Sequence, residues 1–241
     1  MKRGFIRGLW GIYDSSHRLL NRRFGIDHDI KVILNCKFNQ PFTVYIMGEE
    51  NYKKLISTGI EKLGHKVVMV SKEPFMFDLI KYQYRNKIEV IKYAMEQDGY
   101  DELVYLDWDC IPQKEIPSDF WESQGKREPF QACLQRYKRP KCPWRSNENS
   151  AIHKVPNGGY LYIRDKSIPS TAAKIWANEI GQPDNDEIAW AKMTDDMFGG
   201  WNGDDFYYEK FETMYCNLHR MSPLPQEKLQ SKDICFMHYQ G

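Results

Sequence analysis

The sequence predicts an α/β fold built on a mostly parallel, doubly wound sheet. In the first half of the chain, apolar segments of strand length alternate with segments of helical periodicity. Parallel strands need a crossover connection, usually a helix, so this alternation is typical of an open twisted sheet with helices on its faces. A chain of 241 residues is long enough for a substantial core.

The regular alternation runs from residue 8 to residue 106. Apolar residues at helical spacing predict one helix over residues 52–63, capped by Gly64, and a second over residues 80–95 that stops near Gly99. The short apolar segments around these helices predict strands at 8–13, 43–47, 67–70 and 103–106. Together they form a βαβαβ pattern, and such connections are right-handed.

After residue 109 the pattern is less regular. Strands are expected at 131–134, 160–163 and 234–237, and helices at 170–180 and 186–192. The intervening residues 135–156 are predicted to form an exposed loop. Because the sequence has no internal repeat, low-complexity tract or obvious linker, we expect a single domain.

Composition excludes several classes of protein. Lys plus Arg number 34 and Asp plus Glu 33, so net charge gives no reason to expect a polyanion-binding surface over the whole protein. The six cysteines form no C-x-x-C pair, which favours free thiols in a reducing compartment over a zinc site. No signal-peptide core and no apolar run near the ~18 residues of a membrane span are present. We expect a soluble cytoplasmic protein, in the host cytoplasm if the chain is viral.

The strongest candidate for a site is an acidic pair at a strand end. The apolar run 103–106 leads directly into Asp107 and Asp109. Residues i and i+2 of an extended segment point the same way, so both carboxylates can converge on one cation. Ligand sites of open α/β sheets lie at that end of the strands, and Mg²⁺ bound to a diphosphate uses one or two carboxylates. The alternative is that Asp107 caps the strand or a turn.

Further along the chain, a glycine pair and two helix-opening carboxylates are candidates for binding. Gly158 and Gly159 follow Asn157, and glycines here permit a close approach of backbone to a ligand. An ordinary turn entering a strand explains them equally well. Asp186 and Glu187 open a predicted helix, where carboxylates also stabilise the helix dipole without any role in binding.

Three further candidate residues have basic side chains. Arg85 and Lys87 lie on the helix before the acidic pair, where a lysine can also belong to a solvated helix face. His238 follows an apolar strand near the end of the sequence. A lone histidine is more often structural, but a neutral imidazole binds Mn²⁺ well beside carboxylates.

In order, these motifs resemble those of the GT-A glycosyltransferases, and most closely the family 8-like branch that uses nucleotide-diphosphate sugars. The resemblance is carried by L-D-x-D at 106–109, Tyr-Arg-Asn-Lys at 84–87, the Asn-Gly-Gly strand at 156–163, the acidic segment 184–190 and His-x-x-Gly at 238–241. It covers most of residues 8–241. It implies one GT-A domain with a Rossmann-like twisted sheet, a nucleotide-binding half at 1–110, and a sugar- and acceptor-binding half at 111–241 with a smaller acceptor-side subregion.

The resemblance also implies roles. Mn²⁺ or Mg²⁺ would be held by Asp107, Asp109 and His238. A UDP-linked sugar donor would contact Tyr13, which stacks on the base, and Asp14, which accepts from a uracil N–H. Its ribose, phosphates and sugar would contact Asp107, Arg85, Lys87, Asn157, Gly158 and Gly159. Asp186 and Glu187 would be catalytic, beside the transferred sugar, and the reaction would retain the anomeric configuration.

Two departures from the family pattern stand out. The family often has a lysine soon after the last glycine, and this lysine contacts a donor phosphate. Here we expect either that another cation replaces it or that the mechanism differs slightly. Trp108 stands where a small residue is usual, so it either narrows the donor pocket or packs outward. Without the resemblance, Tyr13 would be a core residue and Asp14 a turn residue.

A basic cluster interleaved with aromatic residues is a candidate acceptor site. Its members are Arg136, Lys138, Arg139, Lys141, Trp144 and Arg145. This pattern suits a nucleic-acid backbone with stacked or flipped bases, although a charge run is more often a solvated loop. If the cluster binds the acceptor, that acceptor is a polyanion, either DNA carrying a hydroxylated base, as phage sugar-transferases modify, or a phosphorylated glycan or lipid head group.

The sequence therefore predicts transfer of a sugar from a nucleotide-diphosphate donor to an acceptor hydroxyl. A nucleotide-sugar nucleotidyltransferase is the first alternative, but it needs a glycine-rich loop after the first strand, and residues 14–18 contain no glycine. An inactive carbohydrate-binding module of the same fold is the second alternative.

Overall fold

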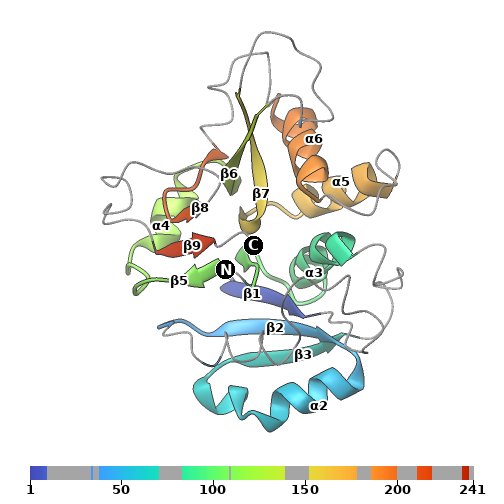
Figure 1. Ribbon diagram of the computed structural model, residues 1–241, viewed down its shortest axis with the longest axis vertical. Coiled ribbons are helices and arrows are strands. Elements are labelled where there is room, and N and C mark those ends of the chain that lie inside the picture. Colours follow the sequence, from blue (N-terminus) through green and yellow to red (C-terminus); the bar gives the residue numbers. More distant parts are fainter. Residues whose placement is uncertain are drawn as a thin grey trace.

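The computed structural model describes residues 1–9, 34, 38–70, 83–108, 110–138, 152–177, 186–199, 211–218 and 235–238. At its centre lies a six-stranded sheet with the order β3-β2-β1-β4-β7-β6 (Figure 1). The strands are β1 (Arg3–Leu9), β2 (Phe42–Met47), β3 (Lys66–Val70), β4 (Glu102–Leu106), β6 (Phe130–Lys138) and β7 (Ile152–Ile163). Strands β1 to β4 are parallel, and β7 runs antiparallel to both of its neighbours. The predicted mostly parallel α/β sheet is confirmed.

The strand order contains a switch point. From β1 the chain moves outward to β2 and β3, and then returns to β4 on the other side of β1. The connection after β1 runs to one side of the sheet, and the connection that leads to β4 runs to the other side. Open α/β sheets bind ligands at such a point, next to the carboxyl ends of the two strands, here β1 and β4.

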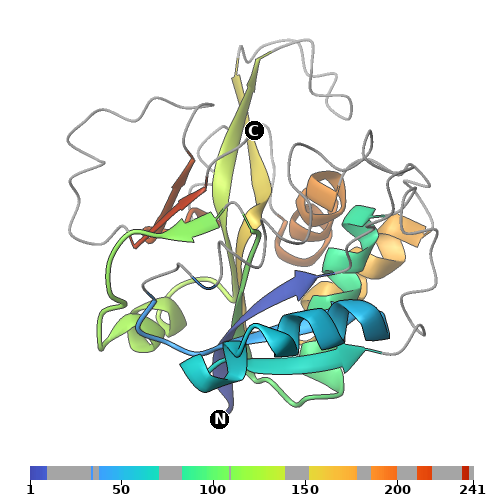
Figure 2. The same ribbon diagram turned by 60° about the horizontal axis from the view of Figure 1, so that its bottom comes forward.

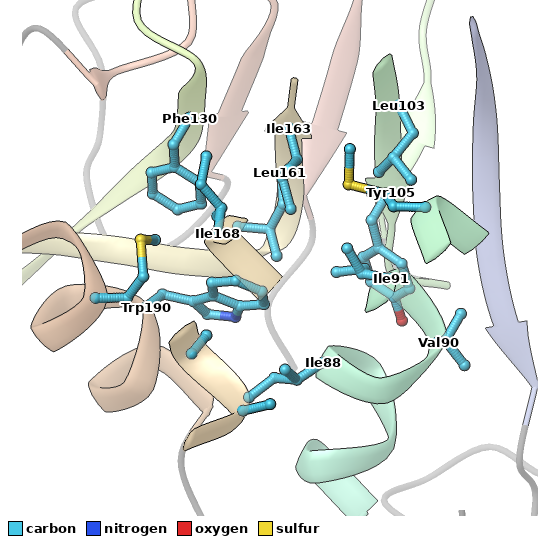
Figure 3. Packing of buried hydrophobic residues seen from close by; sticks show 14 of the residues in the cluster. Ile88, Val90, Ile91, Leu103, Tyr105, Phe130, Leu161, Ile163, Ile168 and Trp190 are labelled. Carbon is cyan, nitrogen blue, oxygen red and sulfur yellow. The ribbon is translucent and has the colours of Figure 1, made fainter. Parts of the chain in front are cut away.

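Both faces of the sheet are covered. Helices α3 (Gln83–Glu96), α5 (Ser167–Ile175) and α6 (Asp186–Phe198) pack on one face, and Figure 3 shows Ile88, Ile91 and Trp190 of this layer against Leu103 and Leu161 of the sheet. The other face is covered by α2 (Glu49–Ser57), the 3-10 helix η2 (Ile60–Leu63), α4 (Phe120–Gly125) and a three-stranded sheet. That sheet has the order β5-β9-β8, from β5 (Cys110–Pro112), β9 (Phe236–His238) and β8 (Cys216–Leu218) (Figure 2).

The position of β4 in the middle of the sheet explains why residues 103–106 are all apolar. Leu103 and Tyr105 belong to the core on the α3 side, whereas Val104 and Leu106 belong to the core on the opposite side. A central strand that is buried on both faces has no polar alternation. The same period places the next odd-numbered residue, Asp107, on the α3 and α6 side.

Several predicted boundaries were wrong. The first strand begins at Arg3 rather than at residue 8, because its early residues pair with Glu102 and its neighbours in β4. The helix predicted over 52–63 is divided: α2 ends at Ser57, Gly59 takes φ 77°, and η2 follows, with Gly64 at φ 88° as the predicted cap.

The predicted exposed loop at 135–156 was also wrong at both ends. Residues 135–138 extend β6 and residues 152–156 extend β7, and these segments pair with each other. This pairing is not visible in local sequence, because it joins segments that are separated along the chain. Strands β5 and β8 were missed for a similar reason, since each has three residues.

Two further features concern the cysteines and the helices of the described ranges. Cys110, Cys133, Cys216 and Cys235 are buried thiols. Within these ranges, no helix combines the length and the apolar character needed to cross a membrane.

Candidate active site

Asp107 is the first residue after β4 and lies at the switch point of the sheet. Its backbone N–H donates to the carbonyl of Gly159 over 2.9 Å, which continues the pairing of β4 with β7 by one residue. The carboxylate accepts from Tyr105 Oη at 3.0 Å and from Lys87 Nζ at 2.8 Å. Burial and the Asp107 carboxylate raise the pKa of Tyr105, so its hydroxyl keeps the proton that it donates.

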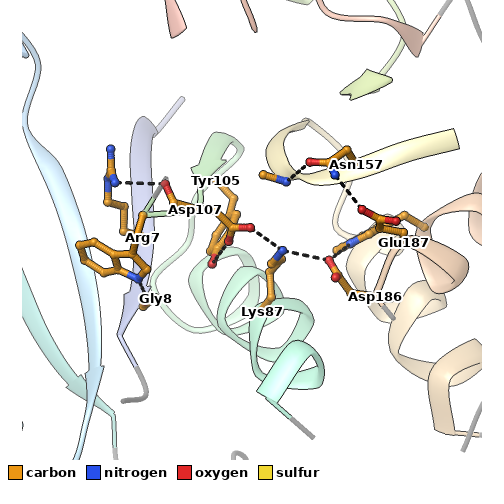
Figure 4. A network of polar contacts seen from close by, with 11 residues as sticks. Arg7, Gly8, Lys87, Tyr105, Asp107, Asn157, Asp186 and Glu187 are labelled. Carbon is orange, nitrogen blue, oxygen red and sulfur yellow. Dashed lines mark hydrogen bonds and ion pairs between the residues drawn. The ribbon is translucent and has the colours of Figure 1, made fainter. Parts of the chain in front are cut away.

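Lys87 joins two carboxylates from different parts of the chain. From helix α3, its Nζ lies 2.8 Å from Asp107 Oδ2 and 3.1 Å from Asp186 Oδ2 (Figure 4). Its side chain is 4% exposed, which rules out the alternative that Lys87 belongs to a solvated helix face. Burial by itself would lower the pKa of Lys87, but the attraction of the two carboxylates outweighs it and raises the pKa. Lys87 is therefore an ammonium ion at neutral pH.

The start of α6 is fixed by two side-chain contacts. Asp186, its first residue, is buried and accepts from Trp190 Nε1 one turn later at 3.1 Å. Glu187 Oε1 accepts from Asn157 Nδ2 at 2.7 Å, and Asn157 Oδ1 accepts from the backbone N–H of Gly159 at 2.9 Å. Asp186 therefore points into the protein, rather than forming a solvated first turn.

The glycine pair lies in an irregular part of β7. Pairing with β6 jumps from Ala132↔Leu161 to Cys133↔Asn157, so residues 158–160 are left without a partner in the β6 register. Bulges of this kind are frequent next to active sites because they redirect side chains. Asn157, Gly158 and Gly159 thus lie within the strand, and the alternative of an ordinary turn entering it was wrong.

Side chains of the site occupy the space where Cβ atoms of these glycines would lie. A Cβ at Gly158 would overlap the carboxylate of Asp186 and the ammonium group of Lys87. A Cβ at Gly159 would overlap the imidazole ring of His238. The two glycines are therefore required by the close approach of three functional side chains to the β7 backbone.

His238 is brought to the site by the three-stranded sheet β5-β9-β8. In β9 it pairs with Cys110, the first residue of β5, and its side chain is 3% exposed. Asp107 and His238 both contact Gly159, so the structure brings the middle and the end of the chain together. Asp109 lies outside the described residues. Within the described residues, no group of three or more His, Cys, Asp and Glu side chains is placed to hold a metal ion.

A buried arginine, which sequence reasoning missed, holds the turn after β4. Arg7 donates from Nη1 to the Asp107 carbonyl and from Nη2 to the Cys110 carbonyl, each over 3.1 Å. Trp108 Nε1 donates to the Gly8 carbonyl at 2.7 Å, so the indole N–H of Trp108 is directed back toward β1. A charged residue within the otherwise apolar end of β1 was the signal that could have identified Arg7.

Other predicted site residues lie elsewhere or outside the described ranges. Arg85 contacts Glu89 on its own helix and the Ala173 carbonyl, so it joins α3 to α5. The backbones of Arg136 and Lys138 lie in β6. The predicted residues outside the described ranges are Tyr13, Asp14, Asp109, Arg139, Lys141, Trp144 and Arg145.

Neither a protein-family model nor a curated protein matches the sequence. Among solved structures, the chain is similar to the apo form of mouse xyloside xylosyltransferase 1, with TM-score 0.52 and 8% identity over 99% of this chain and 97% of that one. It is also similar to the glycosyltransferase GlyE of Streptococcus pneumoniae, with TM-score 0.49 and 11% identity, over 100% of this chain and 55% of GlyE. The likeness to the mouse enzyme spans nearly all of both chains and shows a common fold, which confirms the predicted GT-A type fold class.

The glycine pair yields one prediction. Gly158→Ala and Gly159→Ala should each destabilise the protein by about 1–3 kcal/mol, because the added methyl group forces Lys87, Asp186 or His238 from its position. Chemical denaturation measures this change. Gly125→Ala is the matched control, because a Cβ there meets its nearest atoms at 3.8 Å. Equal stability of all three variants would contradict the close approach.

Lys87 yields a second prediction. Lys87→Met should cost about 3–5 kcal/mol of unfolding free energy, because it leaves the buried Asp186 carboxylate without its cation. The double variant Lys87→Met/Asp186→Asn should recover part of that loss, since the uncompensated charge is gone. A double-mutant cycle by urea unfolding measures the coupling. Additive effects would show that the two groups do not interact.

Proposed function

We propose that this protein is a metal-dependent glycosyltransferase that moves a sugar from a UDP-linked donor to an acceptor hydroxyl. The observation that carries the proposal is the convergence of Asp107, Lys87, Asp186 and His238 around the Gly158–Gly159 backbone. This convergence occurs at the carboxyl ends of β1 and β4, on a fold shared with a xylosyltransferase. Acidic, cationic and backbone groups in one place suit a substrate that carries both a diphosphate and a polyhydroxy ring.

The donor set suits a divalent cation. Asp107 supplies a carboxylate that is 24% exposed, and the buried imidazole of His238 contacts the same glycine that binds the Asp107 backbone. Carboxylate and imidazole together suit Mn²⁺. We assign Asp107, Asp109 and His238 to the ion, with Mg²⁺ as the other candidate. When bound, the ion neutralises charge that develops on the departing diphosphate.

Lys87 is the protein's own cation at the site. Its raised pKa keeps it charged, and its two carboxylate contacts hold the ammonium group in a fixed position between β4 and α6. A preorganised cation stabilises charge that develops in the transition state without the cost of reorganising solvent. We therefore assign the phosphate contact to Lys87 rather than to Arg85, whose guanidinium contacts Glu89 and Ala173.

Asp186, Glu187 and the glycine pair would hold the transferred sugar. The bond between the anomeric carbon and the β-phosphate oxygen breaks, the bond from the acceptor oxygen to that carbon forms, and the proton of the acceptor hydroxyl passes to an oxygen of the departing diphosphate. The anomeric carbon becomes electron-poor, so the carboxylate of Asp186 favours this state. Asn157 positions Glu187, and the lack of side chains at Gly158 and Gly159 lets Asp186, Lys87 and His238 lie directly against the β7 backbone. Retention of configuration is proposed from the family resemblance alone.

Thermal unfolding with UDP and Mn²⁺ tests the proposal. UDP plus Mn²⁺ should raise the melting temperature of the wild-type protein by more than either one alone, because the proposed ion would be held by Asp107 and would favour binding of the diphosphate. Binding at 100 times Kd stabilises by about 2.7 kcal/mol, an effect that thermal shift measures readily. Asp107→Asn should lose the Mn²⁺-dependent part of the shift.

Asp119→Asn is the matched control, since it removes the same charge from an exposed residue at the start of α4. An unchanged Mn²⁺-dependent shift in Asp107→Asn would refute the metal role. Stabilisation by UTP in preference to UDP would favour a nucleotidyltransferase, and no response to any nucleotide would favour an inactive module.

A further inference from the structure

The strands β6 and β7 continue beyond the central sheet as a two-stranded ribbon. Residues 133–138 of β6 pair with residues 152–157 of β7, while β7 pairs with β4 only at residues 160–163. Figures 1 and 2 show the far end of this ribbon extending away from the two core layers, whereas Cys133 and Leu134 at its near end are buried in them. We call residues 133–138 and 152–157 the ribbon. Two-stranded ribbons on their own are marginally stable, and the buried residues at the near end anchor this one to the core.

The ribbon carries positive charge and no negative charge. Its register places Arg136 directly opposite Lys154, and Lys138 two positions along from Arg136, so all three positions share one face. None of its residues is Asp or Glu. Like charges directly opposite each other destabilise a strand pair. An anionic partner would relieve this repulsion, and the positive charge is local, since the chain as a whole has a net charge of only +1.

The shape of the ribbon indicates which anionic partner fits. The major groove of a nucleic-acid duplex is about 12 Å wide and admits a two-stranded β-ribbon. A phosphorylated glycan would supply charge, but it has no groove that matches such a ribbon. The ribbon also leads into the candidate site: Lys154 lies three residues before Asn157, whose side chain contacts Glu187. At about 3.3 Å per residue, this separation is roughly 10 Å along the strand.

We propose that the ribbon docks duplex DNA, so that the acceptor hydroxyl is carried on a base edge in the major groove. The assignment of the duplex as acceptor rests on the proposed function, but the docking itself does not require the sugar donor. Arg136, Lys138 and Lys154 contact phosphates on the two sides of the groove. These contacts are independent of sequence, and the site at the base of the ribbon faces the groove.

Binding of the full chain to a 20-base-pair DNA duplex tests the docking. Fluorescence anisotropy across a range of salt concentrations should give a steep fall of affinity with salt. The slope of log K against log salt is about −0.9 for each phosphate contact. Arg136→Gln/Lys154→Gln should make this slope less steep by about two, because each basic residue accounts for about one contact.

Lys62→Gln/Lys66→Gln is the matched control, since it removes the same charge near β3, at the opposite edge of the sheet. Its slope should equal that of the wild-type protein. Thermal unfolding of both variants checks that they are folded. Wild-type protein that does not bind the duplex, or equal slopes in the two variants, would overturn the docking.

Two further outcomes separate the hypotheses. Binding of a sulfated glycan as tightly as the duplex would overturn the duplex assignment, since charge alone would then explain the ribbon. Wild-type protein that responds to UDP plus Mn²⁺ but does not bind DNA would overturn this inference and leave the proposed function in place. DNA binding without any response to UDP would overturn the proposed function and leave the docking in place.

Discussion

The contact between one lysine and two carboxylates organises this site. Lys87 comes from α3, Asp107 from the end of β4 and Asp186 from the start of α6, and the ion pairs hold these three elements together. Two carboxylates this close would repel each other without a cation. The ammonium group of Lys87 compensates the charge of both carboxylates in the folded protein. In the proposed function, the same group is the cation that contacts the diphosphate. Stability and proposed chemistry therefore depend on the same contact.

The glycine pair is the second constraint, and it follows from the first. The bulge in β7 brings the backbone of residues 158 and 159 against the side chains of Lys87, Asp186 and His238. The resulting site has backbone on one side and charged groups on the other. The same irregularity in register marks the point where β6 and β7 leave the central sheet and become the ribbon. One feature of the backbone thus links the site of proposed sugar transfer to the surface proposed for the acceptor.

The turn after β4 depends on a charge that is fully buried. Arg7 donates to the carbonyls of Asp107 and Cys110, the residues on either side of the segment that also contains Asp109. Its guanidinium lies 4.7 Å from the ring centre of Phe42 and 5.4 Å from that of Trp108, which compensates in part for its removal from water. The positions of Asp107 and Cys110 are therefore set from β1, the neighbour of β4 in the sheet, as well as from β4 itself.

Sequence alone determined the sheet type, most elements of the first half and the place of Asp107 at the end of a buried strand. These followed from local signals: the apolar run of β4, the helical spacing of α3 and Gly64 at a helix end. Only tertiary structure decided that Lys87 is buried between Asp107 and Asp186, that Arg85 joins two helices, that Arg7 supports the turn, and that residues 135–138 and 152–156 are strands. Each depends on contacts between segments distant along the chain. The ion pairs and hydrogen bonds that fix these features join groups that a local sequence pattern does not bring together.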